Sequence, residues 1–141
     1  MYGVIDIARY IIRYCKEKGY YISNLKLQKI LYFVQAEFLV TLHVPCFREN
    51  IEAWDFGPVV PEVYQEYKHF GSSNIIDDAV DVIELPDRDR VLIEGIVDQC
   101  SNYSASQLVE FTHNQSPWLD AYEKYCNNVI SKDSIRKYFE E

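Results

Sequence analysis

The stretch of sequence that decides the fold is Leu25 to Leu42, which reads LKLQKILYFVQAEFLVTL. Ser23 or Asn24 can cap its first turn, and no Gly or Pro interrupts it before Pro45. At a helical period one face carries Leu27, Leu31, Val34, Phe38 and Leu42. Because a helix that is apolar nearly all round is normally covered by its neighbours, the sequence predicts a central helix over about residues 24–42.

The charged residues of this stretch argue against a membrane span, for which its length would otherwise suffice. Two lysines and a glutamate, together with two glutamines, lie within its eighteen residues. The helical period places Lys26 and Lys29 with Glu37 and Thr41 on a narrow polar stripe, opposite the main apolar face. We expect that stripe to face solvent.

Two glutamines of the central helix stand apart from this stripe. Gln28 and Gln35 are seven residues apart, so they share one face, and that face is not the lysine side. A buried amide is costly unless it is hydrogen-bonded. We therefore expect both side chains to bond the backbone of an irregular segment that docks there. The alternative is that both lie at the edge of the polar stripe and meet water.

Length, net charge and cysteine content limit the kind of protein that this chain can be. The 141 residues suffice for one domain, 1–141, with its own core. The net charge of -8 disfavours nucleic acid as the main ligand, although residues 1–30 carry six basic and only two acidic side chains. Four scattered cysteines without a paired motif, and no signal peptide, predict a reducing, cytoplasmic setting.

Local signals predict a mainly α fold, arranged around the central helix with at most a small β strand pair. An amphipathic helix is expected over 4–18, and Pro61 and Pro86 each mark the start of another, the first reaching Gly71. Further helices are expected from Ser104, from Ser116 to about residue 126, and from 131 or 133. Residues 51–56 can form a strand or an extended arm, and an exposed loop over 72–85 carries a short strand near 80–84.

The residues that could carry chemistry do not form a catalytic or metal-binding pattern. Cys46 follows His43 by three residues in a proline-bounded loop, without any further signature of a nucleophile and its base. The three histidines are isolated, and the five glycines form no phosphate-binding loop. The sequence therefore predicts a protein that is not an enzyme and that needs no metal or other cofactor.

Three motifs point to a known family. They are KLQKILY at 26–32, EAW at 52–54 and GPVVPEVY at 57–64. With Gln35, Tyr67 and a weaker match around Thr112, His113 and Trp118, they resemble the SocA/Panacea antitoxin domain, a family that also includes prophage-associated proteins of the GepA type. The resemblance covers most of the chain.

This resemblance implies a bacterial or phage protein that neutralises a toxin, typically by binding it directly. One family member instead acts as an adaptor that delivers its toxin to the ClpXP protease, so adaptor action is the alternative. Regulation of another host protein by a phage or mobile element is a third reading. The expected partner is a protein toxin, with homo-oligomerisation left open.

The motif residues have two readings, a structural one and a partner-binding one. They are Lys26, Gln28, Lys29, Tyr32, Gln35, Glu52, Trp54, Gly57, Pro58, Pro61, Tyr64 and Trp118. Trp54 and the Gly57-Pro58 turn can simply pack over the central helix. Because toxins of the family are diverse, partner choice is expected in exposed segments such as 43–50 and 72–85. Asp77, Asp78 and Asp81 are the partner-binding candidates there, since acidic side chains complement a basic toxin.

Overall fold

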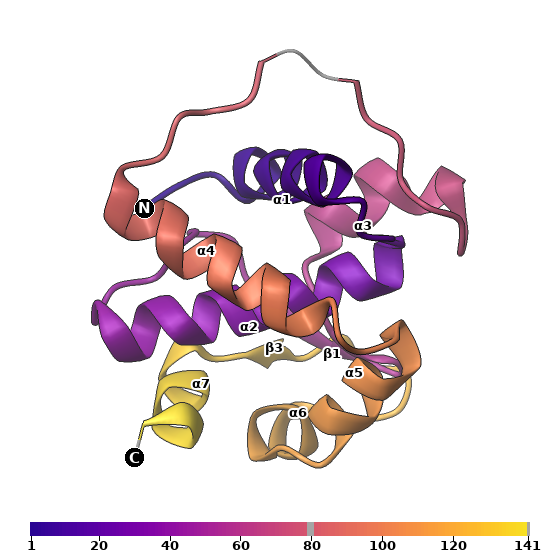
Figure 1. Ribbon diagram of the computed structural model, residues 1–141. Coiled ribbons are helices and arrows are strands. Elements are labelled where there is room, and N and C mark those ends of the chain that lie inside the picture. Colours follow the sequence, from indigo (N-terminus) through magenta and orange to yellow (C-terminus); the bar gives the residue numbers. More distant parts are fainter. Residues whose placement is uncertain (79–80, 141) are drawn as a thin grey trace.

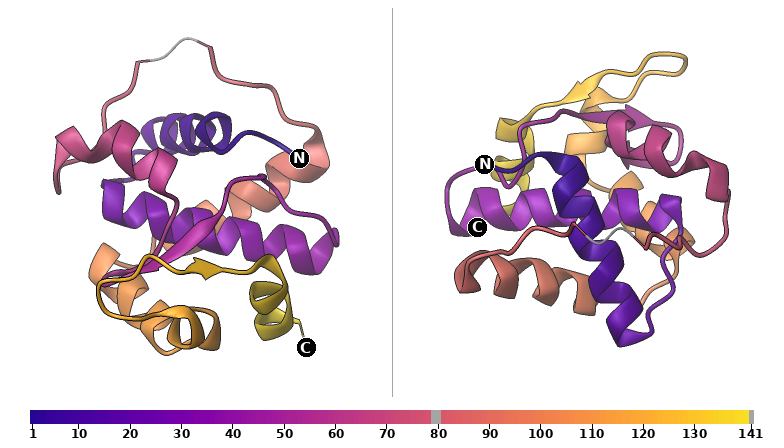
Figure 2. Two further views of the ribbon diagram at one scale, coloured as in Figure 1. Left: turned by 180° about the vertical axis from the view of Figure 1, so that it is seen from behind. Right: turned by 90° about the horizontal axis from the view of Figure 1, so that it is seen from above.

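The fold is organised around one buried helix, as the sequence predicts. The computed structural model describes residues 1–78 and 81–140 (Figure 1). Helix α2 (Asn24–Thr41) runs through its middle, and the Oγ of Ser23 caps it by accepting from the backbone N–H of Lys26 at 3.2 Å. The other helices surround α2: in Figure 1 some lie above it, one crosses in front of it and others lie below it (Figures 1 and 2). None of the described helices is long and apolar enough to cross a membrane.

Six further α-helices of the described residues begin where local signals predict. Pro61 occupies the first turn of its helix, and Ser104 and Gln107 form both bonds of a capping box. Ser131 caps the last helix by accepting from the N–H of Ser134. In chain order they are α1 (Val4–Lys18), α3 (Pro61–Tyr67), α4 (Asp87–Cys100), α5 (Ala105–His113), α6 (Ser116–Ala121) and α7 (Lys132–Phe139).

Two predicted helix ends differ from the structure, one in the type of its last helical turn and one in the length of the helix. The helix from Pro61 ends as α3 at Tyr67 and continues to Phe70 only as the 3₁₀ turn η1 (Lys68–Phe70). The helix from Ser116 stops at Ala121 rather than near residue 126, because Tyr122 adopts an extended backbone with ψ 127°. The chain after it therefore forms an exposed turn.

A small antiparallel sheet lies beside α2. Strand β1 (Ile51–Trp54) lies within the stretch 51–56 that the sequence predicts as a strand or an extended arm. It pairs with β2 (Gly57–Val59), for which no strand is predicted, and β3 (Val129–Ile130) adds a third strand on the other edge of β1. No strand forms at residues 81–84, so the short strand predicted near 80–84 is wrong there, and residue 80 lies outside the described residues.

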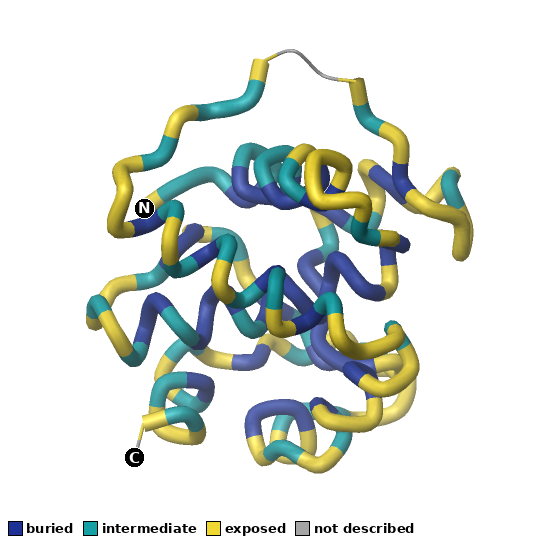
Figure 3. Tube along the Cα trace, in the orientation of Figure 1, coloured by how far each residue is buried: buried dark blue, intermediate teal, exposed yellow. Residues whose placement is uncertain are grey.

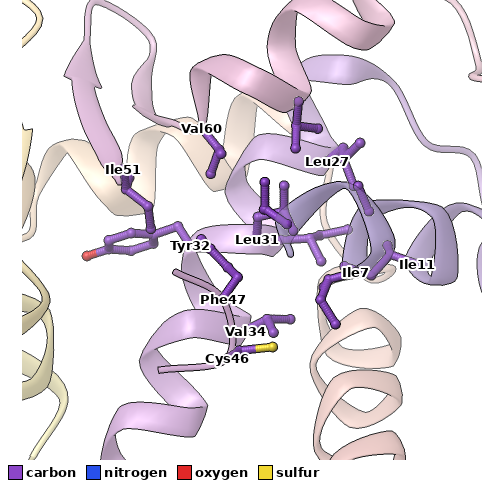
Figure 4. Packing of buried hydrophobic residues seen from close by; sticks show 14 of the residues in the cluster. Ile7, Ile11, Leu27, Leu31, Tyr32, Val34, Cys46, Phe47, Ile51 and Val60 are labelled. Atoms are coloured by element: carbon purple, nitrogen blue, oxygen red, sulfur yellow. The ribbon is translucent and has the colours of Figure 1, made fainter. Parts of the chain in front are cut away.

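The core gathers on both sides of α2. Leu27 and Leu31 of α2 meet Ile7 and Ile11 of α1, while Val60 closes the core next to the sheet (Figure 4). The buried residues form a band through the centre of the trace, with exposed residues on the outer faces (Figure 3). Because α2 lies at the centre, thirteen of its eighteen residues are buried.

Helices α1 and α4 are joined by a tyrosine–carboxylate ladder. Its tyrosine hydroxyls come from α1 and its two flanks, and its carboxylates all come from α4. The bonds are Tyr2 to Asp89, Tyr10 to Glu94 at 2.6 Å, and both Tyr14 and Tyr20 to Asp98 at 2.8 Å. Burial and the neighbouring carboxylates raise the pKa of the Tyr14 hydroxyl, which therefore stays a proton donor. The ladder accounts for part of the high tyrosine content.

Candidate functional site

The two glutamines of α2 are buried and fully engaged, which confirms their predicted role. Gln28 is 1% exposed, and its Oε1 accepts from the N–H of Val60 at 2.8 Å while its Nε2 donates to Asn24. Gln35 holds the loop after α2, because its Oε1 accepts from the N–H of Cys46 at 2.8 Å and its Nε2 donates to the carbonyl of Phe47. The glutamines therefore attach two irregular segments to the central helix.

The lysines of α2 do not form the solvent-facing stripe that the sequence predicts. Lys26 is 7% exposed and Lys29 is completely buried. The Nζ of Lys29 donates to the carbonyl of Pro58 at 2.9 Å. Burial lowers the pKa of Lys29 to about 7, because the ammonium form loses its hydration. The Lys-Leu-Gln-Lys motif thus holds the Gly-Pro motif at two points, one through Gln28 and one through Lys29.

Gly57 is required where β2 begins. Its φ of +103° is a conformation that side chains with a Cβ rarely adopt. A Cβ at this position would lie 2.7 Å from the Cε of Lys29 and 2.8 Å from the Oγ1 of Thr112. The glycine therefore lets the hairpin backbone approach both the buried lysine and α5.

The turn between β1 and β2 is held by three aromatic rings from the C-terminal half. Trp118 donates its indole N–H to the carbonyl of Trp54 at 2.8 Å, and the ring of His113 contacts the carbonyl of Asp55 at 3.0 Å. Tyr122 donates to the carboxylate of Asp55. Trp118 lies between the other two rings, with centroids 4.2 Å from His113 and 4.5 Å from Tyr122. We call these three residues the aromatic clamp.

The sequence motifs include Trp118 of this clamp but do not predict the roles of its two neighbours. Thr112 and His113 belong only to the weaker family match, and Tyr122 carries no signal beyond being aromatic. The clamp bonds join residues that are 58 to 67 positions apart in the chain. A local pattern does not contain such contacts.

Most of the remaining motif residues lie around the same hairpin. Trp54 donates its indole N–H to Glu52 at 2.9 Å, and its ring meets that of Tyr64 edge-on at 5.0 Å. Asn24 donates to the carbonyl of Tyr64 at 3.1 Å, which ties α3 to the start of α2. Tyr32 lies apart from the hairpin and donates to Gln115 at 2.8 Å. The motifs therefore form one connected framework, consistent with their structural reading.

A groove of about 580 Å³ opens at the surface of this framework. Its lining comes from the start of α2, the β1–β2 turn, α3 with η1, and the turn after α6. Most of its large side chains are aromatic, and Phe56 and Tyr125 are 67% and 93% exposed. Its lining includes Leu25, Trp54, Asp55, Phe56, Tyr64, Lys68, Tyr125 and Cys126. We call this the hairpin groove.

The three aspartates predicted to bind a partner lie away from the hairpin groove. Asp77 accepts from the hydroxyl of Tyr67 at 2.8 Å, and Asp78 pairs with Lys16 of α1 at 3.0 Å. Asp81 is exposed. The described parts of the segment from η1 to α4 arch over α1 in Figure 1, and the ion pair with Lys16 joins Asp78 to α1. Their role in partner binding stays a prediction.

The cysteines differ sharply in exposure. Cys15, Cys46 and Cys100 are buried, and burial raises the pKa of the Cys15 and Cys100 thiols to about 12 and about 11. Burial likewise raises the pKa of Cys46, which is the opposite of what a nucleophile needs. Cys126, predicted to lie in a helix, is exposed in the turn after α6. Within residues 1–78 and 81–140, no group of three or more His, Cys, Asp or Glu side chains could hold a metal ion.

A groove with an apolar aromatic centre, set on a rigid frame, is the kind of surface that proteins use to contact other proteins. The chain belongs to the SocA-like Panacea antitoxin family, whose model (Antitoxin SocA-like, Panacea domain) matches residues 27–119. One relative, Antitoxin SocA of Caulobacter vibrioides (strain NA1000 / CB15N), is 40% identical over 137 residues, which cover 82% of this chain and 72% of that protein. No solved structure matches the chain.

The family match begins in α2 and ends in α6. It therefore contains the glutamines and the buried lysine of α2, the whole β1–β2 hairpin and two of the three rings of the aromatic clamp. The family resemblance read from the sequence motifs is confirmed, while the likeness to prophage proteins of the GepA type stays a prediction.

Proposed function

We propose that this protein is an antitoxin that neutralises a cognate protein toxin by binding it directly and stoichiometrically. The observation that carries the proposal is the family membership, with a relative named Antitoxin SocA at 40% identity. The hairpin groove supports it, because exposed aromatic side chains on a rigid frame supply binding energy at little entropic cost. No enzymatic step is needed for such an activity.

The experiment is co-expression with the product of the neighbouring gene, chosen because antitoxins are commonly encoded beside their toxins. Expression of that gene alone should arrest growth, and co-expression of this protein should restore it. The two proteins should then co-elute from a size-exclusion column as a complex of fixed ratio. Titrating this protein into the purified toxin should reduce toxin activity linearly up to the equivalence point, since each antitoxin blocks one toxin.

Three other results would each rule out direct neutralisation and assign a different activity. Growth rescue accompanied by loss of the toxin, seen only in cells that contain ClpXP, would assign the chain an adaptor role. Full inhibition at a small fraction of equivalence would mean that the protein acts catalytically. Rescue without a detectable complex and without a change in toxin level would point to a different host target.

A further inference from the structure

The β1–β2 turn presents an apolar side chain on a fixed backbone. Phe56 is 67% exposed at the turn, although the residues on both sides of it are held in place. On one side, the aromatic clamp fixes the carbonyls of Trp54 and Asp55. On the other, Lys29 fixes the carbonyl of Pro58. A large exposed side chain is normally mobile, so holding its backbone on both sides lowers the entropy lost when a partner binds it.

A second exposed ring in the lining of the hairpin groove is Tyr125, which also lies in a closed turn. Tyr125 is 93% exposed and has a φ of +67°, which is unusual for a residue other than glycine. The bridge between Glu123 and Cys126 closes the turn that carries it. Backbone strain that exposes an aromatic ring costs stability and adds nothing to the core, and such strain gathers at binding sites.

The charges next to the groove indicate what it accommodates. The segments 52–72 and 120–127 supply most of its lining, and together they contain six acidic residues and two lysines. Asp55 lies in the lining, and the exposed Glu123 is two residues from Tyr125. Lys68 is the only basic residue of the lining, and no ion pair within the described residues involves it. The lining itself is charge-balanced by Asp55 and Lys68, whereas the flanking parts of these two segments carry an excess of acidic residues. An apolar centre with acidic flanks suits an apolar side chain that has cations beside it.

We propose that the hairpin groove is the surface that receives the toxin. Its occupant is an exposed segment of the cognate toxin that packs one bulky apolar side chain into the groove, against the exposed rings of Phe56 and Tyr125. Lysine or arginine residues beside that side chain meet the carboxylates around the groove. This inference rests on the proposed function and specifies where the partner binds and what chemistry the partner presents.

The first test compares two groove variants with a matched control, using the toxin that the co-expression experiment identifies. Phe56→Ala and Tyr125→Ala each remove an exposed ring, so neither should unfold the protein. If these rings are binding hot spots, each variant should weaken the complex by at least about 30-fold in biolayer interferometry. The control is Tyr103→Ala, which removes another exposed aromatic side chain outside the groove and should change the affinity less than about twofold.

The second test needs no change in the protein, because Cys126 lies in the groove and is the only exposed thiol of the four. A maleimide reagent should label it rapidly in the free protein and slowly in the complex. Protein labelled beforehand with a bulky maleimide should fail to bind the toxin. The Cys126→Ser variant should bind normally and be unaffected by the reagent, which separates steric blocking from damage to the fold.

The third test concerns charge. Reversing Asp120 and Glu123 to lysine should weaken binding at low salt, and the difference from the wild type should shrink as salt is added. Reversal of the aspartates in segment 77–81 should change the affinity less than this pair does.

The outcomes distinguish failure of the groove as the toxin-binding surface from failure of the proposed antitoxin function. If the wild type binds the toxin but both ring variants bind it within about twofold of the wild type, or Cys126 stays reactive in the complex, the groove is not the interface. If the wild type forms no complex with the toxin, the proposed function fails, and this inference fails with it. If the protein alone dimerises and Cys126 is protected in the dimer, the occupant is a second copy and the toxin segment is wrong.

Discussion

Replacing the buried Lys29 by methionine should remove one specific component of the pH dependence of stability. The pKa of Lys29 falls from 10.5 to about 7 on folding. At 1.36 kcal/mol per pKa unit, the folded protein therefore disfavours the ammonium form by about 5 kcal/mol. Methionine has a similar length and no charge, so Lys29→Met eliminates this cost and leaves the carbonyl of Pro58 without its donor.

The sign follows from proton binding. Between pH 7 and 10.5 the side chain of Lys29 is protonated in the unfolded chain and neutral in the folded protein, so the unfolded state binds more protons and stability rises with pH. Below pH 7 it is charged in both states, and above pH 10.5 it is neutral in both. We expect Lys29 to raise the free energy of unfolding by about 1 kcal/mol between pH 7.5 and 8.5.

The buried thiols lower the free energy of unfolding as the pH rises, which is opposite to the effect of Lys29. The pH profile of the wild type alone therefore does not isolate the lysine, and comparison with Lys29→Met is needed. Cys15 and Cys100 have pKa values raised above 9 by folding, so they reduce stability as the unfolded thiols ionise. The wild type and Lys29→Met share this contribution. The difference between their unfolding free energies therefore isolates the lysine.

The assay is urea unfolding followed by tryptophan fluorescence at pH 7.5, 8.0 and 8.5. At pH 7.5 the variant should be more stable by about 1–3 kcal/mol, because the loss of the bond to Pro58 offsets part of the gain. That advantage should shrink by about 1 kcal/mol at pH 8.5. Parallel pH profiles for the two proteins would refute the reasoning, since they would mean that Lys29 keeps the same protonation on folding.

Four other predictions follow from the fold. Leu31→Ala should lower the free energy of unfolding by about 2–5 kcal/mol in chemical denaturation, because it leaves a cavity in the core. Gly57→Ala should destabilise by at least about 2 kcal/mol in the same assay, and should weaken toxin binding by misplacing Phe56. Tyr14→Phe should lower the thermal midpoint, with a loss of about 1 kcal/mol for its bond to Asp98. Reversing the aspartates of segment 77–81 together should slow toxin association and flatten its salt dependence in stopped-flow measurements, without unfolding the protein; unchanged rates would remove them as partner contacts.

The parts of the fold that the sequence predicts well are those decided by neighbouring residues. The apolar period of α2, the cap at Ser23 and the capping box at Ser104 are local, and the structure contains all three. The burial of Gln28 and Gln35 was also predictable, because both amides lie on an apolar side of the helix. Strand β3 was not, since two residues are too short for a period to appear.

The candidate site was only half predictable, for a physical reason. A helical wheel assigns charged residues to solvent, yet Lys29 is buried because Pro58, far along the chain, supplies a carbonyl for it. The aromatic clamp depends on the same kind of distant contact. The family motifs contain the residues of the β1–β2 hairpin. The shape of the groove depends in addition on Tyr125, whose positive φ is not predicted by any motif.

The central position of α2 has a consequence for synthesis on the ribosome. Residues 24–41 leave the ribosome early, but α4, α5 and α7, which cover them, extend to residue 139. A nascent chain that has not yet reached α7 therefore exposes apolar surface of α2. Before α6 is synthesised, the chain also lacks rings of the aromatic clamp that fixes the β1–β2 turn. Prematurely terminated chains should be degraded as unfolded protein, and the dose of active protein in a cell should follow the number of chains translated through α7.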